Sequence, residues 1–262
     1  MALIVTGHAR SGTSLLWTLC NQHPDIRLTL EFGNFRGINS PTPAYLLRLG
    51  SGWLRRANLL QPVLHKPSLK PWECRLRNHT FFFRYAWKII RAGKPVVDGA
   101  VISSAMKDLL KDHRIVGDKY PNYIFSLDKL VGNSGLSLLV IYRDCRDVVS
   151  SVLKKVRTEW SSFTFARNID TAPKIALHWM QAIETMELFA AHLYIIRYED
   201  LVRHPEDTLA ALGAWLDVDP KAFPAGWVRD ASIGKYKTGL TDQELRETLD
   251  IAGPTMQRFG YV

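Results

Sequence analysis

The chain has 262 residues, of which 47% are hydrophobic and 23% are charged, and these ordinary fractions exclude a disordered, collagen-like or coiled-coil protein. Thirty-four Lys and Arg against 25 Asp and Glu give a formal net charge of +9. A basic excess of this size fits an anionic partner, such as a nucleotide, a nucleic acid, an acidic glycan or a membrane surface, as well as a merely soluble surface.

Neither a membrane span nor an export signal is expected. The sequence contains no uncharged apolar window of about 18 residues, and no basic segment precedes its first apolar stretch. The three cysteines, Cys20, Cys74 and Cys145, lack CxxC spacing, which argues against a disulfide framework and a structural zinc site. These features predict a cytoplasmic protein.

Apolar runs with strand and helix periodicities alternate along most of the chain. In chain order, the expected elements are a strand at residues 3–5, a helix with Leu15, Leu16 and Leu19 on its apolar face, strands at residues 114–116 and 136–142, a helix with Val148, Val149, Val152, Leu153 and Val156 on its apolar face, a helix at residues 172–192, a strand at residues 193–196, and a helix that begins at Pro205. This alternation predicts an α/β fold with a central, mostly parallel sheet covered by helices.

Residues 33–113 depart from this alternation. They contain several prolines and an aromatic-basic segment at residues 79–88 (HTFFFRYAWK). We interpret them as a helical insertion within a single domain that spans residues 1–262, since no repeat or low-complexity linker divides the chain.

Residues 7–14 (GHARSGTS) form the strongest local motif, between the first strand and the first helix. A loop at this position points backbone N–H groups and a helix N-terminus at an anion, although an ordinary glycine turn is the alternative. Its Gly-x4-Gly spacing is that of the nucleoside-triphosphate P-loop, but Thr13 stands where that loop has its Lys. A kinase needs the missing Lys and a metal-bound hydroxyl. With Arg10 as its cation, the loop instead suits a 5′-phosphate that carries a transferable group, without a metal.

Residues 10–14 resemble the loop that grips the 5′-phosphosulfate in PAPS-dependent sulfotransferases (PAPS is 3′-phosphoadenosine 5′-phosphosulfate), nearest in style to the tyrosylprotein and bacterial branch. That family binds the 3′-phosphate with an Arg at a strand end and a Ser eight residues later, and Arg143 and Ser151 have this separation. The family usually has Pro at the position of Cys145. The resemblance implies a P-loop NTPase-like three-layer fold, PAPS as the donor and adenosine 3′,5′-bisphosphate as the product.

Two fainter matches complete the expected nucleotide site. Tyr198, in a Tyr-Glu-Asp-Leu segment, resembles a tyrosine near the nucleotide in some members, with a packed helix-cap Tyr as the alternative. Lys235 and Lys237 resemble a late basic loop that closes over the nucleotide, with a solvated loop as the alternative. The resemblance thus assigns to the nucleotide Arg10, Ser11, Gly12, Thr13, Ser14, Arg143, Ser151, Tyr198, Lys235 and Lys237.

Three residues are the expected catalytic groups. Arg10 is placed to stabilise the leaving phosphate during in-line displacement. In the tyrosylprotein branch, a similar His-Pro-Asp segment leads to a Glu that lies 21 residues after the loop Arg, and Glu31 has that position here, where a strand-end surface Glu is the alternative. Lys119, in a segment similar to Glu/Asp-Lys-Thr-Pro-Asn, is expected near the transferred group or in a structural ion pair. If the base is instead a His, the next candidates are His8, His65 and His113.

The leading hypothesis is therefore a sulfotransferase that acts on a hydroxyl or amine. The alternatives are a P-loop nucleoside or sugar kinase and a non-catalytic module that binds a nucleotide or a polyanion through the aromatic-basic segment. No RRM, KH or zinc-finger signature is present, so no nucleic acid partner is expected. The acceptor, whether a small molecule, a glycan or a protein, and the oligomeric state stay open.

Overall fold

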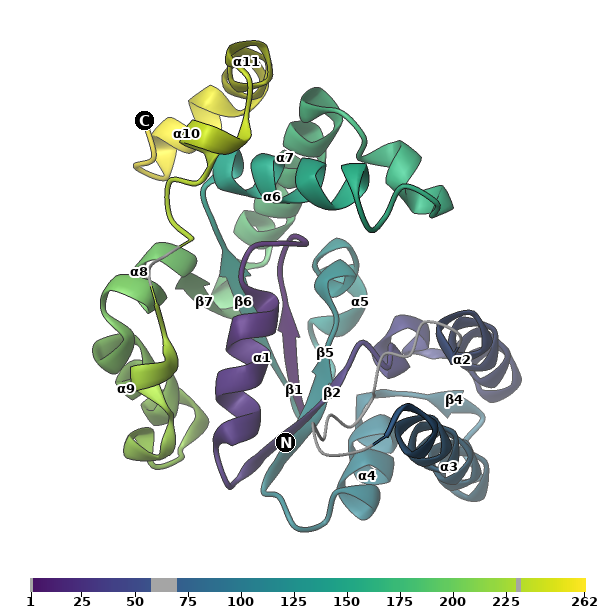
Figure 1. Cartoon of the computed structure of the whole chain (residues 1–262). Coiled ribbons are helices and arrows are strands. Elements are labelled where there is room, and N and C mark those ends of the chain that lie inside the picture. The colour runs from purple at the N-terminus through teal and green to yellow at the C-terminus, as the bar shows by residue number, and fades with distance from the viewer. Residues whose placement is uncertain (1, 58–69, 230–231) are drawn as a thin grey trace.

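The computed structural model describes residues 2–57, 70–229 and 232–262 and contains a parallel five-stranded sheet (Figure 1). The strand order is β2-β5-β1-β6-β7, and every neighbouring pair is parallel. The strands are β1 (Ala2–Thr6), β2 (Ile26–Leu30), β5 (Ile115–Lys119), β6 (Leu136–Tyr142) and β7 (Leu193–Arg197).

The strands are apolar on both faces because the sheet lies between two hydrophobic cores. On β1, Leu3 and Val5 pack into one core, and Ala2 and Ile4 pack into the other. The first core is covered by α1 (Thr13–Gln22), α8 (Tyr198–Arg203) and α9 (Pro205–Leu216). The second is covered mainly by α4 (Gly99–Leu109), α6 (Cys145–Arg157), α7 (Ala172–Leu188) and α11 (Asp242–Arg258). This arrangement confirms the predicted three-layer α/β fold.

The segment between β2 and β5 has two parts. Its helix α4 packs on the sheet and serves as the crossover between these parallel strands. The helices α2 (Thr42–Ala57) and α3 (Pro71–Arg91) lie farther out at the edge of the molecule (Figure 1), next to the short antiparallel pair β3 (Ser40–Pro41) and β4 (Val96–Val97). The remaining short elements are α5 (Leu127–Leu130), α10 (Tyr236–Gly239), η1 (Asn34–Gly37), η2 (Pro121–Ser126), η3 (Thr164–Asn168), η4 (Ala190–His192), η5 (Pro220–Ala222) and η6 (Ala225–Trp227).

Two predicted boundaries are wrong. The strand expected at residues 114–116 runs over 115–119, because its pairing with β1 and β2 continues through Gly117, Asp118 and Lys119, which no apolar run marks. The helix expected at residues 172–192 ends at Leu188, and a 3-10 turn then leads into β7. The chain must turn there because Leu193 pairs with Leu138, a tertiary requirement that the alanines at 190–191 do not signal.

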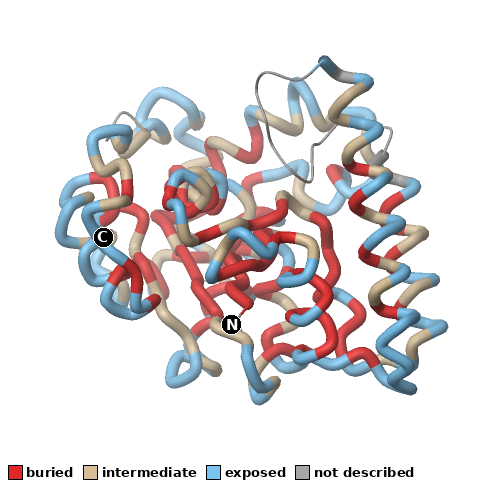
Figure 2. Tube along the Cα trace, turned by 90° about the horizontal axis from the view of Figure 1, so that it is seen from below, coloured by how far each residue is buried: buried red, intermediate tan, exposed pale blue. Residues whose placement is uncertain are grey.

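The sheet topology places the expected ligand-binding edge of the fold at the carboxyl end of β1. The chain leaves β1 through α1 toward β2 on one side, whereas β6 and β7 lie on the other side. In open α/β sheets, ligands bind in the crevice where the strand order reverses in this way. The central strands β1 and β5 are buried along their whole length, within the red interior of the tube in Figure 2. Within the described ranges, none of the helices is both long enough and apolar enough to cross a membrane.

Candidate active site

The loop between β1 and α1 has a backbone that only glycine permits at two positions. Gly7 and Gly12 have φ values of +148° and +102°. A Cβ atom on Gly7 would lie 2.1 Å from the carbonyl oxygen of Ile141, and one on Gly12 would lie 2.4 Å from the Tyr198 ring. The loop therefore packs directly on β6 and α8. Because no side chain among the described residues caps α1 at Gly12, the first N–H groups of that helix can bind a ligand.

Replacement of Gly12 by Ala is expected to lower the free energy of unfolding by about 2 kcal/mol, because the new methyl group meets the Tyr198 ring in a left-handed backbone. Thermal or urea unfolding measures this loss. The matched control is Gly253→Ala, since Gly253 has open space around its Cβ position and lies inside α11. The control should be unchanged or slightly more stable, and equal losses in both variants would contradict the expectation.

Buried polar atoms in and beside the loop fit an anion. The Ser11 hydroxyl and the Arg143 Nε are buried, and neither has a hydrogen-bond partner among the described residues. Buried donors are nearly always satisfied in native proteins. Thr13 is buried and Ser14 exposed at the start of α1. The donors at the loop therefore fit a phosphate group.

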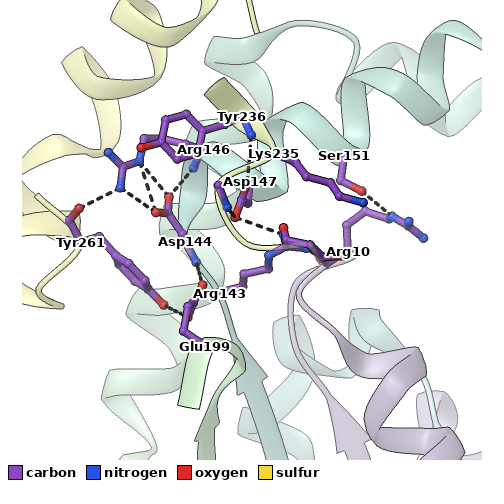
Figure 3. Close-up of polar contacts among 12 residues, drawn as sticks. Arg10, Arg143, Asp144, Arg146, Asp147, Ser151, Glu199, Lys235, Tyr236 and Tyr261 are labelled. Atoms are coloured by element: carbon purple, nitrogen blue, oxygen red, sulfur yellow. Dashed lines mark hydrogen bonds and ion pairs between the residues drawn. The ribbon is translucent and has the colours of Figure 1, made fainter. Parts of the chain in front are cut away.

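Arg10, Arg143 and Ser151 form one cluster at the rim of the loop (Figure 3). The Arg10 Nε donates to the Ser151 hydroxyl at 2.9 Å. Arg143, which follows β6, donates to the carbonyl oxygens of Arg10 and Ser232 and lies over the Tyr198 ring, 4.5 Å from its centroid. Partial desolvation and the nearby Arg143 lower the pKa of Arg10, so an anion placed here would relieve a concentration of positive charge.

Asp147 connects this cluster to the late loop at residues 232–237. Its carboxylate lies 3.1 Å from the Arg143 guanidinium and accepts the backbone N–H groups of Gly234 and Tyr236 at 2.9 and 3.0 Å. Sequence reasoning missed Asp147, although it lies four residues after Arg143, a separation at which ion pairs are common. The first turn of α6 thus fixes the late loop over the arginine.

The two lysines of the late loop lie in different places. Figure 3 shows the Lys235 side chain extending toward Ser151 and Arg10. Lys237 instead lines a neighbouring cleft of about 260 Å³, together with Arg146 and Tyr236, whose ring lies 4.4 Å from the Arg146 guanidinium carbon. The structure brings Lys235 to the cluster and places Lys237 beside it.

Tyr198 is buried at the start of α8, between Gly12 and Arg143. Its neighbour Glu199 was not identified from the sequence. The Glu199 carboxylate accepts the backbone N–H of Asp144 at 3.1 Å and the Tyr261 hydroxyl at 2.8 Å. These contacts connect the ends of β6 and β7 to the C-terminal residues beside Arg143.

The expected catalytic residues Glu31 and Lys119 meet on the other side of the loop. The Lys119 Nζ lies 2.8 Å from the Glu31 carboxylate and 3.4 Å from the Ser14 hydroxyl, and the lysine side chain is only 2% exposed. The contact arises because Leu30 pairs with Lys119 in adjacent parallel strands. Glu31 itself has a φ of +54°, which turns the chain out of the sheet. Both residues therefore lie at the carboxyl edge where the phosphate loop begins.

Asp118 fixes the turn that follows Glu31, and it was also missed from the sequence. Its buried carboxylate accepts the Thr29 and Tyr123 hydroxyls, each at 2.7 Å, and the N–H groups of Phe32 and Gly33 at 3.0 and 2.8 Å. Burial raises the pKa of Asp118. This side chain acts on the site through the backbone that carries Glu31.

His8 and His113, the two histidine candidates that the structure describes, make their hydrogen bonds to residues other than Glu31 and Lys119. His113 precedes β5, at the amino end of the sheet, and its ring contacts the Pro24 carbonyl. His65 lies outside the described residues. His8 is buried and makes two contacts, at 2.7 Å to the carbonyl oxygen of Ala9 and at 3.0 Å to the His178 ring.

Burial, followed by the effect of His178, lowers the pKa of His8 to about 3, so its ring is neutral near pH 7. Since a carbonyl can only accept, His8 donates from Nδ1 to Ala9 and accepts at Nε2 from the Nδ1–H of His178. Protonation of His8 would place two N–H groups against each other. His8 thus connects the loop to α7 through hydrogen bonds to Ala9 and His178.

This pairing predicts a specific acid sensitivity. The folded state binds the His8 proton less readily than the unfolded state, so stability falls as the pH drops below about 6.5, by about 2 kcal/mol at pH 5. Urea unfolding at several pH values should show a flatter profile for His8→Asn between pH 7 and pH 5. The control His192→Asn, at an exposed position, should keep the wild-type slope. Parallel profiles for all three proteins would contradict the assignment.

A parallel sheet between two helical layers, with a glycine-containing loop between β1 and α1, is a P-loop-like α/β fold. A sequence model of the Sulfotransferase family matches residues 2–222, and the chain therefore belongs to the sulfotransferase family, whose members are enzymes that transfer a sulfuryl group. This membership confirms the predicted activity class, and neither the kinase nor the non-catalytic alternative is favoured.

Solved structures of similar fold are also sulfotransferases. The chain resembles the sulfotransferase domain of the Synechococcus PCC 7002 olefin synthase, with a TM-score of 0.58 and 18% identity over 97% of this chain and 94% of that one. It resembles the sulfotransferase domain of the curacin biosynthetic pathway, with a TM-score of 0.59 and 16% identity over 97% and 96%. It also resembles the sulfotransferase STF9 from Mycobacterium avium, with a TM-score of 0.52 and 16% identity over 98% of this chain and 76% of that one. At these identities the likeness shows the fold. No curated protein matches the chain in sequence.

Proposed function

We propose that this sulfotransferase uses PAPS as its donor and transfers the sulfuryl group to a hydroxyl or amine, releasing adenosine 3′,5′-bisphosphate. The observation that carries the donor assignment is the arrangement of two anion sites at one crevice. The loop at residues 7–14 offers N–H and hydroxyl donors, and the cluster of Arg143, Ser151 and Lys235 lies at its rim. Two adjacent cationic sites suit a nucleotide that carries phosphates at both its 5′ and 3′ positions.

This geometry suggests which residues bind each phosphate of the nucleotide. Ser11, Gly12, Thr13 and Ser14 would hold the 5′-phosphate, and Tyr198 would support the nucleotide from below the loop. Arg143, Ser151, Lys235 and Lys237 would surround the 3′-phosphate side. Bound PAPS would supply the activated sulfuryl group.

Proton transfer is assigned to Glu31. Its carboxylate would accept the proton of the attacking hydroxyl, while Lys119, at 2.8 Å, keeps the carboxylate oriented. The Lys119 ammonium and the Arg10 guanidinium would stabilise the negative charge that grows on the transferred group and the leaving phosphate. Because no step needs a metal, transfer is proposed to proceed without one. The proposed compartment is the cytoplasm, which the small and odd number of cysteines, without CxxC spacing, supports.

Calorimetry and a transfer assay test the proposal together. Adenosine 3′,5′-bisphosphate should bind at least about tenfold more tightly than AMP, since a charge-assisted hydrogen bond to the extra phosphate is worth about 1.5–3 kcal/mol. Labelled PAPS should transfer its sulfuryl group to one class in a panel of phenols, sugars, amines and tyrosine peptides, with and without EDTA. Equal affinity for the two nucleotides, or transfer that EDTA abolishes and Mg²⁺ restores, would overturn the corresponding part of the proposal.

A further inference from the structure

Helix α3 has two opposite faces with large apolar side chains, one buried and one exposed in the part of the chain that the structure describes. Its inner face is buried and consists of Asn78, Phe81, Tyr85 and Ile89. Its outer face consists of large side chains that are each 52% to 66% exposed, at a spacing of four, seven, four and three residues: Trp72, Leu76, Phe83, Trp87 and Ile90. This spacing aligns them in one stripe along about five turns of the helix. A stripe of this size on a soluble surface marks a binding face.

The flanks of this outer face are strongly basic. Residues 70–114 contain ten Lys and Arg but four Asp and Glu, and so carry two thirds of the net charge of the chain. Arg84 and Arg91 follow Phe83 and Ile90 directly and therefore border the stripe on one side. At the C-terminal end of α3, Lys88, Arg91 and Lys94 line a cleft against α4. Among the described residues that line this cleft, Asp108 is the one carboxylate, and it pairs with Lys88 at 2.6 Å.

The position of α3 leaves this face accessible. The helices α2 and α3 lie at the edge of the molecule, away from the sheet (Figure 1), and residues there alternate between buried and exposed along the tube in Figure 2. With 21 residues, α3 is about 31 Å long. The neighbouring α2 adds two exposed leucines, Leu47 and Leu54.

We propose that the outer face of α3 binds the surface of an anionic lipid bilayer. Trp, Phe, Leu and Ile side chains beside Arg and Lys are the composition of a helix that lies in the plane of a membrane interface. The aromatic stripe would enter the headgroup region, and Arg84, Arg91 and Lys94 would contact lipid phosphates. The face is less suited to a single-stranded nucleic acid, because its aliphatic side chains Leu76 and Ile90 cannot stack on bases.

A second copy of the chain is the less suitable occupant. If α3 packed on α3 of another copy, the basic flanks of both copies would lie at one interface and repel each other. The negative surface of an anionic bilayer complements these flanks instead. The proposal concerns a surface separate from the nucleotide site, so it does not depend on which sulfuryl donor or acceptor is used.

Sedimentation with vesicles tests the proposal on the full chain. We expect binding to vesicles of phosphatidylcholine with about 30 mol% phosphatidylserine, weakened by salt, and little binding to phosphatidylcholine alone. Phe83→Ser/Trp87→Ser should lower the partition coefficient by about tenfold or more. Arg84→Gln/Arg91→Gln should lower it by a similar factor on the anionic vesicles only, since each cation near such a surface contributes about fivefold.

The matched control is Leu188→Ser/Trp227→Ser, which removes two exposed apolar side chains from other parts of the surface. This variant should bind vesicles like the wild type, and circular dichroism should show that all variants fold. The proposal is overturned if the wild type stays in solution, or if the α3 and control variants bind equally. It is also overturned if size-exclusion chromatography shows a dimer that Phe83→Ser/Trp87→Ser dissociates, or if single-stranded DNA binds in place of the vesicles.

Discussion

Replacement of Glu31 by Gln should lower the rate of sulfuryl transfer by about 10²–10⁴-fold, the usual contribution of a general base, while nucleotide affinity stays within about twofold. Gln keeps the size of the side chain and can still accept a hydrogen bond from Lys119, 2.8 Å away, but it cannot take the proton of the attacking hydroxyl. The loss therefore falls on the transition state alone. Single-turnover transfer and calorimetry with adenosine 3′,5′-bisphosphate measure the two quantities separately.

Two further variants are compared with Glu31→Gln. Lys119→Met removes both the cation that orients Glu31 and a positive charge proposed to stabilise the transferred group, so it should also lower the rate of transfer. Glu184→Gln, on the exposed side of α7, changes one carboxylate far from the loop in sequence and should leave transfer unchanged. A loss below about threefold in Glu31→Gln would move the base to another residue.

Local signals in the sequence predicted the phosphate loop and the helices around it. The loop is predictable because the spacing of its glycines matches a local backbone requirement, which the structure shows as positive φ values of +148° at Gly7 and +102° at Gly12. The spacing of Arg143 and Ser151 likewise reflects one strand end and two turns of the next helix, α6. Such features depend on neighbours in the sequence and need no knowledge of strand order.

The contacts that complete the site depend on strand order and were not predictable in the same way. Glu31 and Lys119 lie 88 residues apart and meet only because β2 pairs with β5, so the sequence left open whether Lys119 forms an ion pair and with which residue. Asp118 was not predicted as a site residue because its carboxylate accepts backbone N–H groups of the turn after Glu31, a contact that no sequence motif marks. Asp147 was missed for the same reason, since its partners are N–H groups of the distant late loop.

Asp147 both pairs with Arg143 and holds the late loop, so a substitution of Arg143 should affect nucleotide binding and stability together. Arg143→Ala should weaken binding of adenosine 3′,5′-bisphosphate by about tenfold or more, because a charge-assisted contact to the 3′-phosphate is lost. It should also lower the free energy of unfolding by about 3 kcal/mol, because Asp147, whose side chain is 1% exposed, keeps a charge without its cation.

The double variant Arg143→Ala/Asp147→Asn separates these two effects. The substituted amide at position 147 would be neutral, and its single oxygen could still accept one of the two N–H groups, from Gly234 or from Tyr236, which the carboxylate accepts on separate oxygens, so part of the lost stability should return. Nucleotide affinity should stay low, because the cation is still missing, and AMP should bind the wild type and the double variant about equally. If the double variant instead regains wild-type affinity for adenosine 3′,5′-bisphosphate, then Arg143 acts only by positioning the late loop, and the 3′-phosphate must be bound by Ser151 and Lys235.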